Sequence, residues 1–176
     1  KRTGLLEGGV VGTQMSNLGM ELGLKDLGIK FSRAQVGDRY VMQELRDKGW
    51  LLGGESSGHL ICRNLTTTGD GIVAALQVLQ AIQSSRKSLY ELKSQMQKMP
   101  QKMVNLRFGN RVNLSEYPAL DGMVEAMEKR MGGRGRVLLR PSGTEPLVRV
   151  MVEGEDADLV SQYAQELAHD VNQVIS

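Results

Sequence analysis

The chain has 176 residues, enough for one large or two small domains, and its hydrophobic content of 40% and charged content of 24% are ordinary for a globular protein. A net charge of +2, with no basic run carrying interleaved aromatic residues, gives no support for nucleic-acid binding. The single cysteine, Cys62, excludes an internal disulfide, and no apolar run reaches membrane-spanning length, so we expect a cytoplasmic protein without a membrane partner. Because the chain begins at Lys1 rather than at a methionine, we expect a piece of a longer protein.

Strands and helices are expected to alternate through the first half of the chain. Short apolar runs predict the strands, and apolar residues at helical spacing predict the helices. In chain order we expect a strand at 9–12, a helix at 15–27, a strand at 29–36, a helix at 38–48, strands at 50–52 and 60–62, a helix after residue 70 and a helix from 88 to about 99. Asp38 and Asp70 are the expected N-caps of two of these helices. This alternation predicts an α/β layer fold.

The order of elements changes after Pro100, which interrupts the pattern. We expect a strand at 103–108, a helix at 119–131, strands at 137–139 and 147–153, and a last helix at 157–174 whose first turn is acidic. Strand–helix–strand–strand–helix is a small α+β unit. The sequence therefore predicts two domains, residues 1–98 and 99–176.

A polar loop with proline at both sides of its centre lies between the last two expected strands, and it reads Arg140-Pro141-Ser142-Gly143-Thr144-Glu145-Pro146. The Arg140 guanidinium is a planar fork of donors that matches phosphate. Ser142 and Thr144 add hydroxyl donors, and Gly143 lets backbone N–H groups approach an anion closely. The alternative is an ordinary hairpin-like turn with a surface arginine.

A second polar loop, Gly53-Gly54-Glu55-Ser56-Ser57-Gly58-His59, lies between two expected strands of the first domain. Glu55 accepts hydrogen bonds, Ser57 both donates and accepts, and His59 can donate to a phosphate or a hydroxyl. A carboxylate beside a hydroxyl suits the recognition of vicinal sugar hydroxyls. The alternative is a hairpin turn whose polar residues face water.

Four further residues have both a functional and a structural interpretation. Asp38 and Arg39 stand at a strand-to-helix turn, where α/β sheets bind ligands, although a helix cap and a solvated arginine are the simpler explanation. Arg149 on the last strand is either structural or a flanking phosphate contact, and Glu145 is a candidate to orient Arg140. Two histidines and one cysteine do not support a zinc site, and we assign no metal ligand in this chain.

The two loops together resemble the α-D-phosphohexomutase family. Its pattern is a Gly-Glu-x-Ser-Gly-His loop followed by Arg-Pro-Ser-Gly-Thr-Glu-Pro, and both segments occur here in that order. Further matching segments are 11–17, 36–41 and 140–154, so the resemblance covers essentially the whole chain. The Arg-Pro-Ser-Gly-Thr-Glu-Pro form favours glucosamine-type members over phosphomannomutase-like ones.

The resemblance implies that residues 1–98 are most of the family's third domain, an incomplete three-layer α/β/α domain, and that residues 99–176 are its fourth. The fourth domain would be a small α+β unit similar to the TATA-binding-protein-like fold. The residues implied in substrate binding, with Glu55 and Ser57 at the sugar O3 and O4, are Glu55, Ser57, His59, Asp38 and Arg39. The residues implied in phosphate binding are Arg140, Ser142, Gly143, Thr144 and, at the flank, Arg149.

The activity that the resemblance implies is an isomerase reaction between glucosamine 6-phosphate and glucosamine 1-phosphate, in the synthesis of amino-sugar nucleotides and cell-wall precursors. It would proceed through a glucosamine 1,6-bisphosphate-type intermediate and an enzyme phosphoserine. The family's phosphoserine loop and its Asp-x-Asp-x-Asp loop for Mg²⁺ belong to the first two domains, so we expect the catalytic residues in missing N-terminal domains. This chain is then expected to bind a hexosamine phosphate without turning it over. The alternative is a stand-alone sugar-phosphate-binding or interaction module with no catalytic parent.

Overall fold

The computed structural model describes residue 6 and residues 8–176. The chain forms two compact units, Lys1–Lys98 and Met99–Ser176, which are described separately below. None of the described helices is both long enough and apolar enough to cross a membrane.

The first unit is built on a four-stranded sheet with the strand order β2-β1-β3-β4. The strands are β1 (Gly9–Thr13), β2 (Lys30–Ala34), β3 (Leu52–Gly54) and β4 (Leu60–Cys62). β1 pairs in parallel with both β2 and β3, whereas β4 is antiparallel to β3. Because β1, β2 and β3 are parallel, the loops that follow them emerge at the same edge of the sheet.

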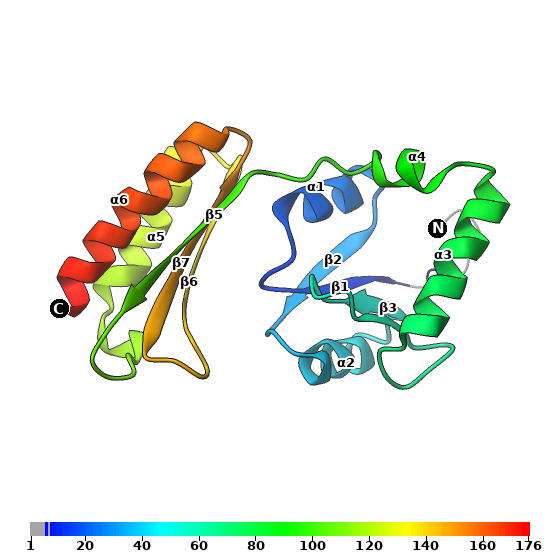
Figure 1. The fold of residues 1–176 in the computed structure, drawn as a ribbon, viewed down its shortest axis with the longest axis horizontal. Helices are drawn as coiled ribbons and strands as arrows, with labels where there is room; N and C mark the ends of the chain where they lie inside the picture. Colours follow the sequence, from blue (N-terminus) through cyan, green and yellow to red (C-terminus); the bar gives the residue numbers. More distant parts are fainter. Residues whose placement is uncertain (1–5, 7) are drawn as a thin grey trace. The chain divides into compact units, whose positions relative to one another are not determined.

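The helices of the first unit are α1 (Leu18–Asp26), α2 (Asp38–Asp47), α3 (Gly71–Ser85) and the short α4 (Leu89–Lys93). Figure 1 shows α1 and α2 on opposite faces of the sheet, so the expectation of a three-layer α/β/α arrangement is confirmed. The core beneath α2 consists of Val11, Ala34, Val41, Met42, Leu45 and Ile61.

Strand β3 contains two glycines that were expected in the turn after it, and one of them packs closely against α2. The sequence predicted this strand at 50–52, but it runs from Leu52 to Gly54. A Cβ added at Gly53 would lie 2.8 Å from Val41 Cγ1 and 3.0 Å from the Val11 carbonyl oxygen. Glycine is needed here because sheet and helix approach each other more closely than a side chain permits.

Two helices of the first unit are shorter than the sequence predicted. α1 begins at Leu18 instead of residue 15, because hydroxyl groups fold the preceding residues into a turn and Asn17 becomes the N-cap, accepting from the Gly19 N–H. α4 begins with a capping box between Ser88 and Glu91, but it ends at Lys93 instead of continuing to about 99. Its residues are mostly exposed, so little tertiary packing extends it.

Asp70 caps α3 as predicted, because its carboxylate accepts from the N–H groups of Ile72 and Val73. The apolar residues whose helical spacing predicted this helix are largely exposed. The exposed apolar side chains are Ile72, Leu76 and Leu79. α3 instead contacts β4 and buries only Ala74 completely.

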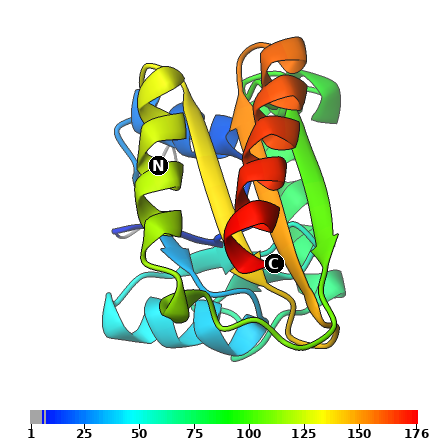
Figure 2. The same ribbon diagram turned by 90° about the vertical axis from the view of Figure 1, so that its left-hand side faces the viewer.

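The second unit has a three-stranded antiparallel sheet with the order β5-β7-β6. Its strands are β5 (Gln101–Arg107), β6 (Gly135–Pro141) and β7 (Leu147–Gly154). Between β5 and β6 lie a 3-10 turn, Leu114–Glu116, and helix α5 (Ala119–Arg130), and β7 leads into α6 (Ala157–Ile175). Both helices cover the same face of the sheet in Figure 2, which confirms the predicted strand–helix–strand–strand–helix order.

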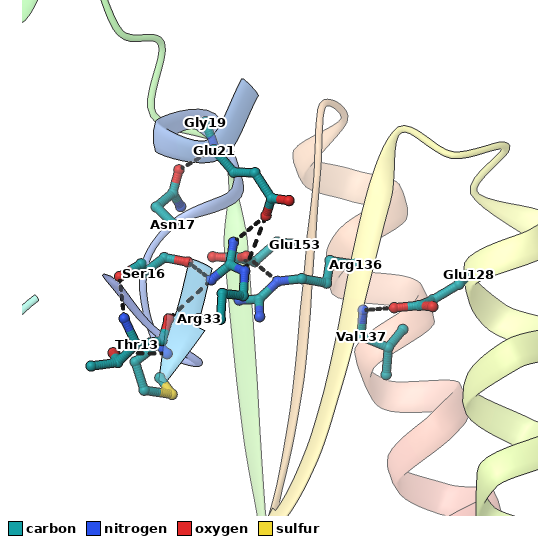
Figure 3. A network of polar contacts seen from close by, with 11 residues as sticks. Thr13, Ser16, Asn17, Gly19, Glu21, Arg33, Glu128, Arg136, Val137 and Glu153 are labelled. Atoms are coloured by element: carbon teal, nitrogen blue, oxygen red, sulfur yellow. Dashed lines mark hydrogen bonds and ion pairs between the residues drawn. The ribbon is translucent and has the colours of Figure 1, made fainter. Parts of the chain in front are cut away.

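The two faces of this second sheet differ in chemistry because successive side chains alternate across a strand. The helix-covered face is a continuous apolar core, which includes Val137, Val150, Val152, Val160, Ala164, Leu167 and Val171. The other face carries the intervening residues of β7, namely Arg149, Met151 and Glu153. One of them, Glu153, is fully buried and paired with Arg136 at 2.8 Å (Figure 3).

One edge of this sheet is capped by a side chain from α5. Glu128 accepts a hydrogen bond of 2.9 Å from the backbone N–H of Val137 on the outer strand β6, as Figure 3 shows. This contact occupies a donor that the neighbouring strand β7 does not use, and it ties α5 to the sheet.

Candidate functional site

Three side chains gather where the loops after β2 and β3 leave the first sheet. His59 Nδ1 lies 3.0 Å from Asp38 Oδ1, and Glu55 Oε1 accepts a 2.7 Å hydrogen bond from the Gly37 N–H. Each of Asp38, Glu55 and His59 offers one atom that could bind a metal ion, and these three atoms lie within 4.8 Å of one another. The structure therefore brings together residues that the sequence placed in two separate motifs.

The two carboxyl groups of this cluster have opposite pKa shifts. Burial raises the pKa of Glu55, and its hydrogen bond with Asp38 raises it further. The pKa of Asp38 is lowered, first by the hydrogen bond from Glu55 and then by the one from His59. Asp38 is therefore the more acidic of the two carboxyl groups.

The prediction that Asp38 caps α2 is wrong. The N-cap position is Gly37, at a φ of 129°, and Asp38 is the first residue of the helix and makes no capping bond. Its carboxylate is instead directed at the side chains of the 55–59 loop. The Gly37 N–H, which precedes the helix, is bound by Glu55.

The other two residues predicted for the substrate site lie outside this cluster. Arg39 is exposed and stacks on the ring of its neighbour Tyr40, with 4.5 Å between the guanidinium carbon and the ring centroid. Ser57 is exposed at the tip of the loop. Neither position is fixed by the cluster, so their substrate roles stay predictions.

The cluster does not match the requirements of the magnesium ion that the family resemblance implies. Mg²⁺ prefers an octahedral set of oxygens, whereas here one of three groups is an imidazole, which contacts Asp38, and Glu55 is bound to the Gly37 N–H. Asp156 and Asp158, the other close acidic pair, begin α6, and Asp156 accepts from N–H groups of its first turn. We therefore assign no metal to these residues.

Sequence reasoning missed Arg33, which organises the loop after β1. Its guanidinium donates to the carbonyl oxygens of Thr13 and Ser16 at 3.1 and 2.6 Å, and to Glu21 on α1 at 3.0 and 2.8 Å (Figure 3). The Ser16 hydroxyl in turn accepts from the Thr13 N–H. An arginine inside a short strand of the sheet was the only signal in the sequence.

Replacing Arg33 with lysine is expected to destabilise the first unit by about 2 kcal/mol. Lysine keeps the charge but cannot hold two carbonyl oxygens and a carboxylate in one planar fork. Chemical unfolding followed by the fluorescence of Trp50, the single tryptophan, measures this loss. Arg46→Lys, at an exposed position of α2, is the matched control. Equal unfolding midpoints for the two variants would contradict a clamping role for Arg33.

A second candidate site lies on the face of the second sheet that the helices leave uncovered. Arg140 on β6 and Arg149 on β7 are directly opposite each other in the antiparallel register. The Nε atoms of both are buried, and neither has a hydrogen-bond partner among the described residues. Burial and then the charge of Arg149 lower the pKa of Arg140. Two like charges that face each other, each with a buried Nε that lacks an acceptor, are unfavourable, so the arrangement favours an anion.

The loop between these strands is shaped by Ser142. Its side chain is buried, and its hydroxyl oxygen lies 3.5 Å from the Thr144 nitrogen and 3.3 Å from the Glu145 nitrogen, both of which donate to it. Gly143 and Thr144 are exposed at the tip. Ser142 thus curls the loop beside Arg140 and keeps its own hydroxyl proton to donate.

The sequence suggested that Glu145 orients Arg140, but the structure shows Glu145 in a different ion pair. It pairs with Arg107, at the end of the other outer strand β5, at 3.5 Å. A neighbouring carboxylate would have neutralised Arg140, so its engagement elsewhere leaves the two guanidinium groups available to an external anion.

Two models of one protein family match this chain, and their matches include the residues of both candidate sites. The model of the phosphoglucomutase/phosphomannomutase α/β/α domain III matches residues 1–99, and that of the C-terminal domain of the same family matches residues 103–170. The chain belongs to this family. It corresponds to the family's third domain and its C-terminal domain.

Among individual members of the family, phosphoglucosamine mutases have sequences similar to this chain. A phosphoglucosamine mutase of Teredinibacter turnerae is 58% identical over 168 residues, which are 96% of this chain and 38% of the relative. One of Legionella pneumophila is 54% identical over 171 residues, 97% of this chain and 38% of the relative. The chain thus spans less than half the length of the relatives it matches.

Solved structures share the fold at low sequence identity. The Aspergillus fumigatus N-acetylphosphoglucosamine mutase, in complex with GlcNAc-6P and magnesium, superimposes with a TM-score of 0.80 at 19% identity, over 97% of this chain and 40% of that one. An N-acetylglucosamine-phosphate mutase in its substrate complex gives 0.75 at 22% identity, over 95% and 39%. Both similarities support the fold of the two units.

Proposed function

We propose that this chain supplies the sugar-binding and phosphate-binding parts of a phosphoglucosamine mutase, which interconverts glucosamine 6-phosphate and glucosamine 1-phosphate. The observation that carries the proposal is the pair Arg140 and Arg149, whose buried Nε atoms lack an acceptor in the described chain. The relatives more than 50% identical over nearly the whole chain are phosphoglucosamine mutases, which supports this substrate over other hexose phosphates.

The phosphate would be held at the second unit. Two guanidinium groups present several N–H donors on one face of the sheet, and a phosphate dianion would offset their mutual repulsion. Ser142 and the exposed loop tip at Gly143 and Thr144 add further donors. These residues bind and orient a phosphate, but none of them is a nucleophile for its transfer.

The sugar would be held at the first unit by the 55–59 loop. Glu55 and Ser57 have the carboxyl and hydroxyl groups needed to bind two adjacent hydroxyls, and His59 is anchored by Asp38. When phosphate moves between O6 and O1 through a bisphosphate, the sugar must bind in two orientations. In these orientations O3 and O4 approximately exchange places, so one carboxyl–hydroxyl loop can serve both.

The phosphoryl transfer itself is assigned to parts of the longer relatives that this chain does not contain. A phosphoserine would carry the phosphoryl group, and Mg²⁺ would stabilise the charge on it. The Aspergillus fumigatus structures with GlcNAc-6P and magnesium and with glucose 1,6-bisphosphate support both the metal and the bisphosphate intermediate in the proposed reaction. This chain then binds and positions the substrate.

Titration of the 176-residue chain with glucosamine 6-phosphate, followed by amide chemical shifts, tests the proposal. We expect shifts at Gly143 and Thr144 with either the sugar phosphate or inorganic phosphate, and shifts at residues 55–59 only when the sugar is present. Unperturbed Gly143 and Thr144 amides would exclude the phosphate site. Mutase activity of the isolated chain would show that the catalytic groups have been assigned to the wrong part of the enzyme.

A further inference from the structure

Helix α3 presents an apolar, uncharged surface to solvent. The exposed fractions of Ile72, Leu76 and Leu79 are 76%, 57% and 59%. These three residues are four and three positions apart, so they lie on one face of the helix, called the α3 face below. The helix Gly71–Ser85 contains no charged residue at all. A helix that faces water normally has charged side chains on its outer side, so the α3 face has the composition of a covered surface.

The first unit holds this helix by a narrow contact only. Within the described residues, α3 packs against β4 and buries Ala74 alone completely, and none of its residues belongs to the core beneath α2. Ala74 and Leu76 are two positions apart, which places them on nearly opposite sides of a helix. The α3 face is therefore directed away from the contact that attaches α3 to the sheet.

The second unit, in contrast, covers its own apolar residues. Its large apolar side chains gather in one continuous core between the helices and the sheet. Among its described residues, the single large apolar side chain that is exposed is Leu159. An element that would cover apolar surface is thus lacking at the first unit and not at the second.

We propose that the α3 face is the docking surface for the polypeptide that precedes this chain in the complete enzyme. Relatives that are 58% and 54% identical over nearly the whole chain have only 38% of their length matched by it. The matched domains are the third and the C-terminal one, so most of the additional length of these relatives comes before the match. Such a polypeptide joins the chain at the first unit, which has the uncovered face.

The lack of charge favours this occupant over a partner that binds and leaves. A surface that is exposed for part of the time needs charged residues to stay soluble. Surfaces that are never separated have instead the composition of a domain core, and parts of one polypeptide remain together. An obligate second copy would also remain in place, but its binding would depend on protein concentration.

Docking on α3 would also fix the candidate sugar site relative to the preceding part of the enzyme. α3 contacts β4, and β4 directly follows the 55–59 loop. The segment that leads into α3 reaches the site as well, because a Cβ added at Gly69 would lie 3.7 Å from His59 Cβ. The inference rests on the proposed function only in that both make this chain part of a longer enzyme.

Thiol labelling of cysteine variants tests the docking surface. Leu76→Cys and the control Gln165→Cys, at an exposed position of α6, are made both in the 176-residue chain and in the complete enzyme. Maleimide modification is followed by mass spectrometry of tryptic peptides, which separates Cys62 from position 76 because Arg63 lies between them. Each rate is divided by the rate in the unfolded protein. We expect Leu76→Cys to react about tenfold more slowly in the complete enzyme than in the 176-residue chain, and Gln165→Cys to react equally in both.

The dependence on concentration identifies the occupant. We expect the slow reaction of Leu76→Cys in the complete enzyme to be the same at every protein concentration. Equal rates for Leu76→Cys in the two proteins would overturn the proposal, because the face would then be open in the complete enzyme. Protection that grew with concentration would overturn it too, because a second copy would be the occupant. The measurement uses no ligand, so failure of the complete enzyme to bind glucosamine 6-phosphate would refute the proposed function alone.

Discussion

Replacing Arg140 with methionine is expected to weaken the binding of glucosamine 6-phosphate about 10- to 100-fold, since a charge-assisted, bidentate contact is lost. The same change is expected to stabilise the ligand-free second unit, by about 1 kcal/mol, because it removes a positive charge opposite Arg149 whose buried Nε lacks an acceptor. A residue that only served the fold would not improve stability when removed. Calorimetric titration with the ligand and thermal unfolding without it measure the two effects.

The control for this experiment is Arg134→Met. Arg134 lies at the start of the same region of the chain, is highly exposed and pairs with Glu155 at the surface. Its replacement removes the same charge and leaves Arg140 and Arg149 in place, so phosphate affinity should be retained. If Arg140→Met bound phosphate as tightly as Arg134→Met, Arg140 would be an ordinary residue of the turn. In the complete enzyme, Arg140→Met is expected to raise KM and lower kcat.

Replacing Arg136 with methionine is expected to destabilise the second unit by about 3 kcal/mol. Glu153 has no exposed surface, and Arg136 donates to it through Nε at 3.1 Å and Nη2 at 2.8 Å. Removal of Arg136 takes these two charge-assisted hydrogen bonds from a carboxylate in the interior, which costs far more than the pair contributes when intact. Hydrogen exchange of the β7 amides at Val150 and Val152 reports this loss for the second unit alone.

The double variant Arg136→Met, Glu153→Met separates this explanation from loss of packing. Two methionines fill the space without a buried charge, so most of the lost stability should return. Arg130→Met, at an exposed ion pair with Glu166, is the surface control and should change exchange little. If the double variant were no more stable than Arg136→Met, the destabilisation would come from packing and not from the charge of Glu153.

Much of the fold could be predicted because it depends on local patterns. Short apolar runs and apolar periodicity located the seven strands of the described residues and the main helices, and Asp70, Ser88 and Asp156 marked helix starts that the structure contains. The predicted helix start was wrong where polar side chains bind backbone N–H groups that would otherwise donate within a helix. The turn between β1 and α1 delays that helix because the hydroxyls of Thr13 and Ser16 bind backbone N–H groups within it.

The candidate sites were predicted as loops but not as arrangements of side chains. Asp38 and His59 are 21 residues apart, and no local rule shows that they meet or that Asp38 consequently leaves its helix uncapped. The pairing of Arg107 with Glu145 and the clamp of Arg33 on Thr13 likewise join distant segments. Such contacts depend on strand register and loop closure, which a sequence pattern does not specify.

The contact between Glu128 and the Val137 N–H has a consequence for solubility. The outer strand of a sheet exposes unpaired backbone donors and acceptors, onto which a strand of another molecule can add. On β6 one of these donors is already bound, and the carboxylate that binds it brings a negative charge to the edge. A second chain that approached this edge would have to displace Glu128 before it could extend the sheet. The side chain that joins helix to strand therefore also protects this strand against edge-to-edge aggregation.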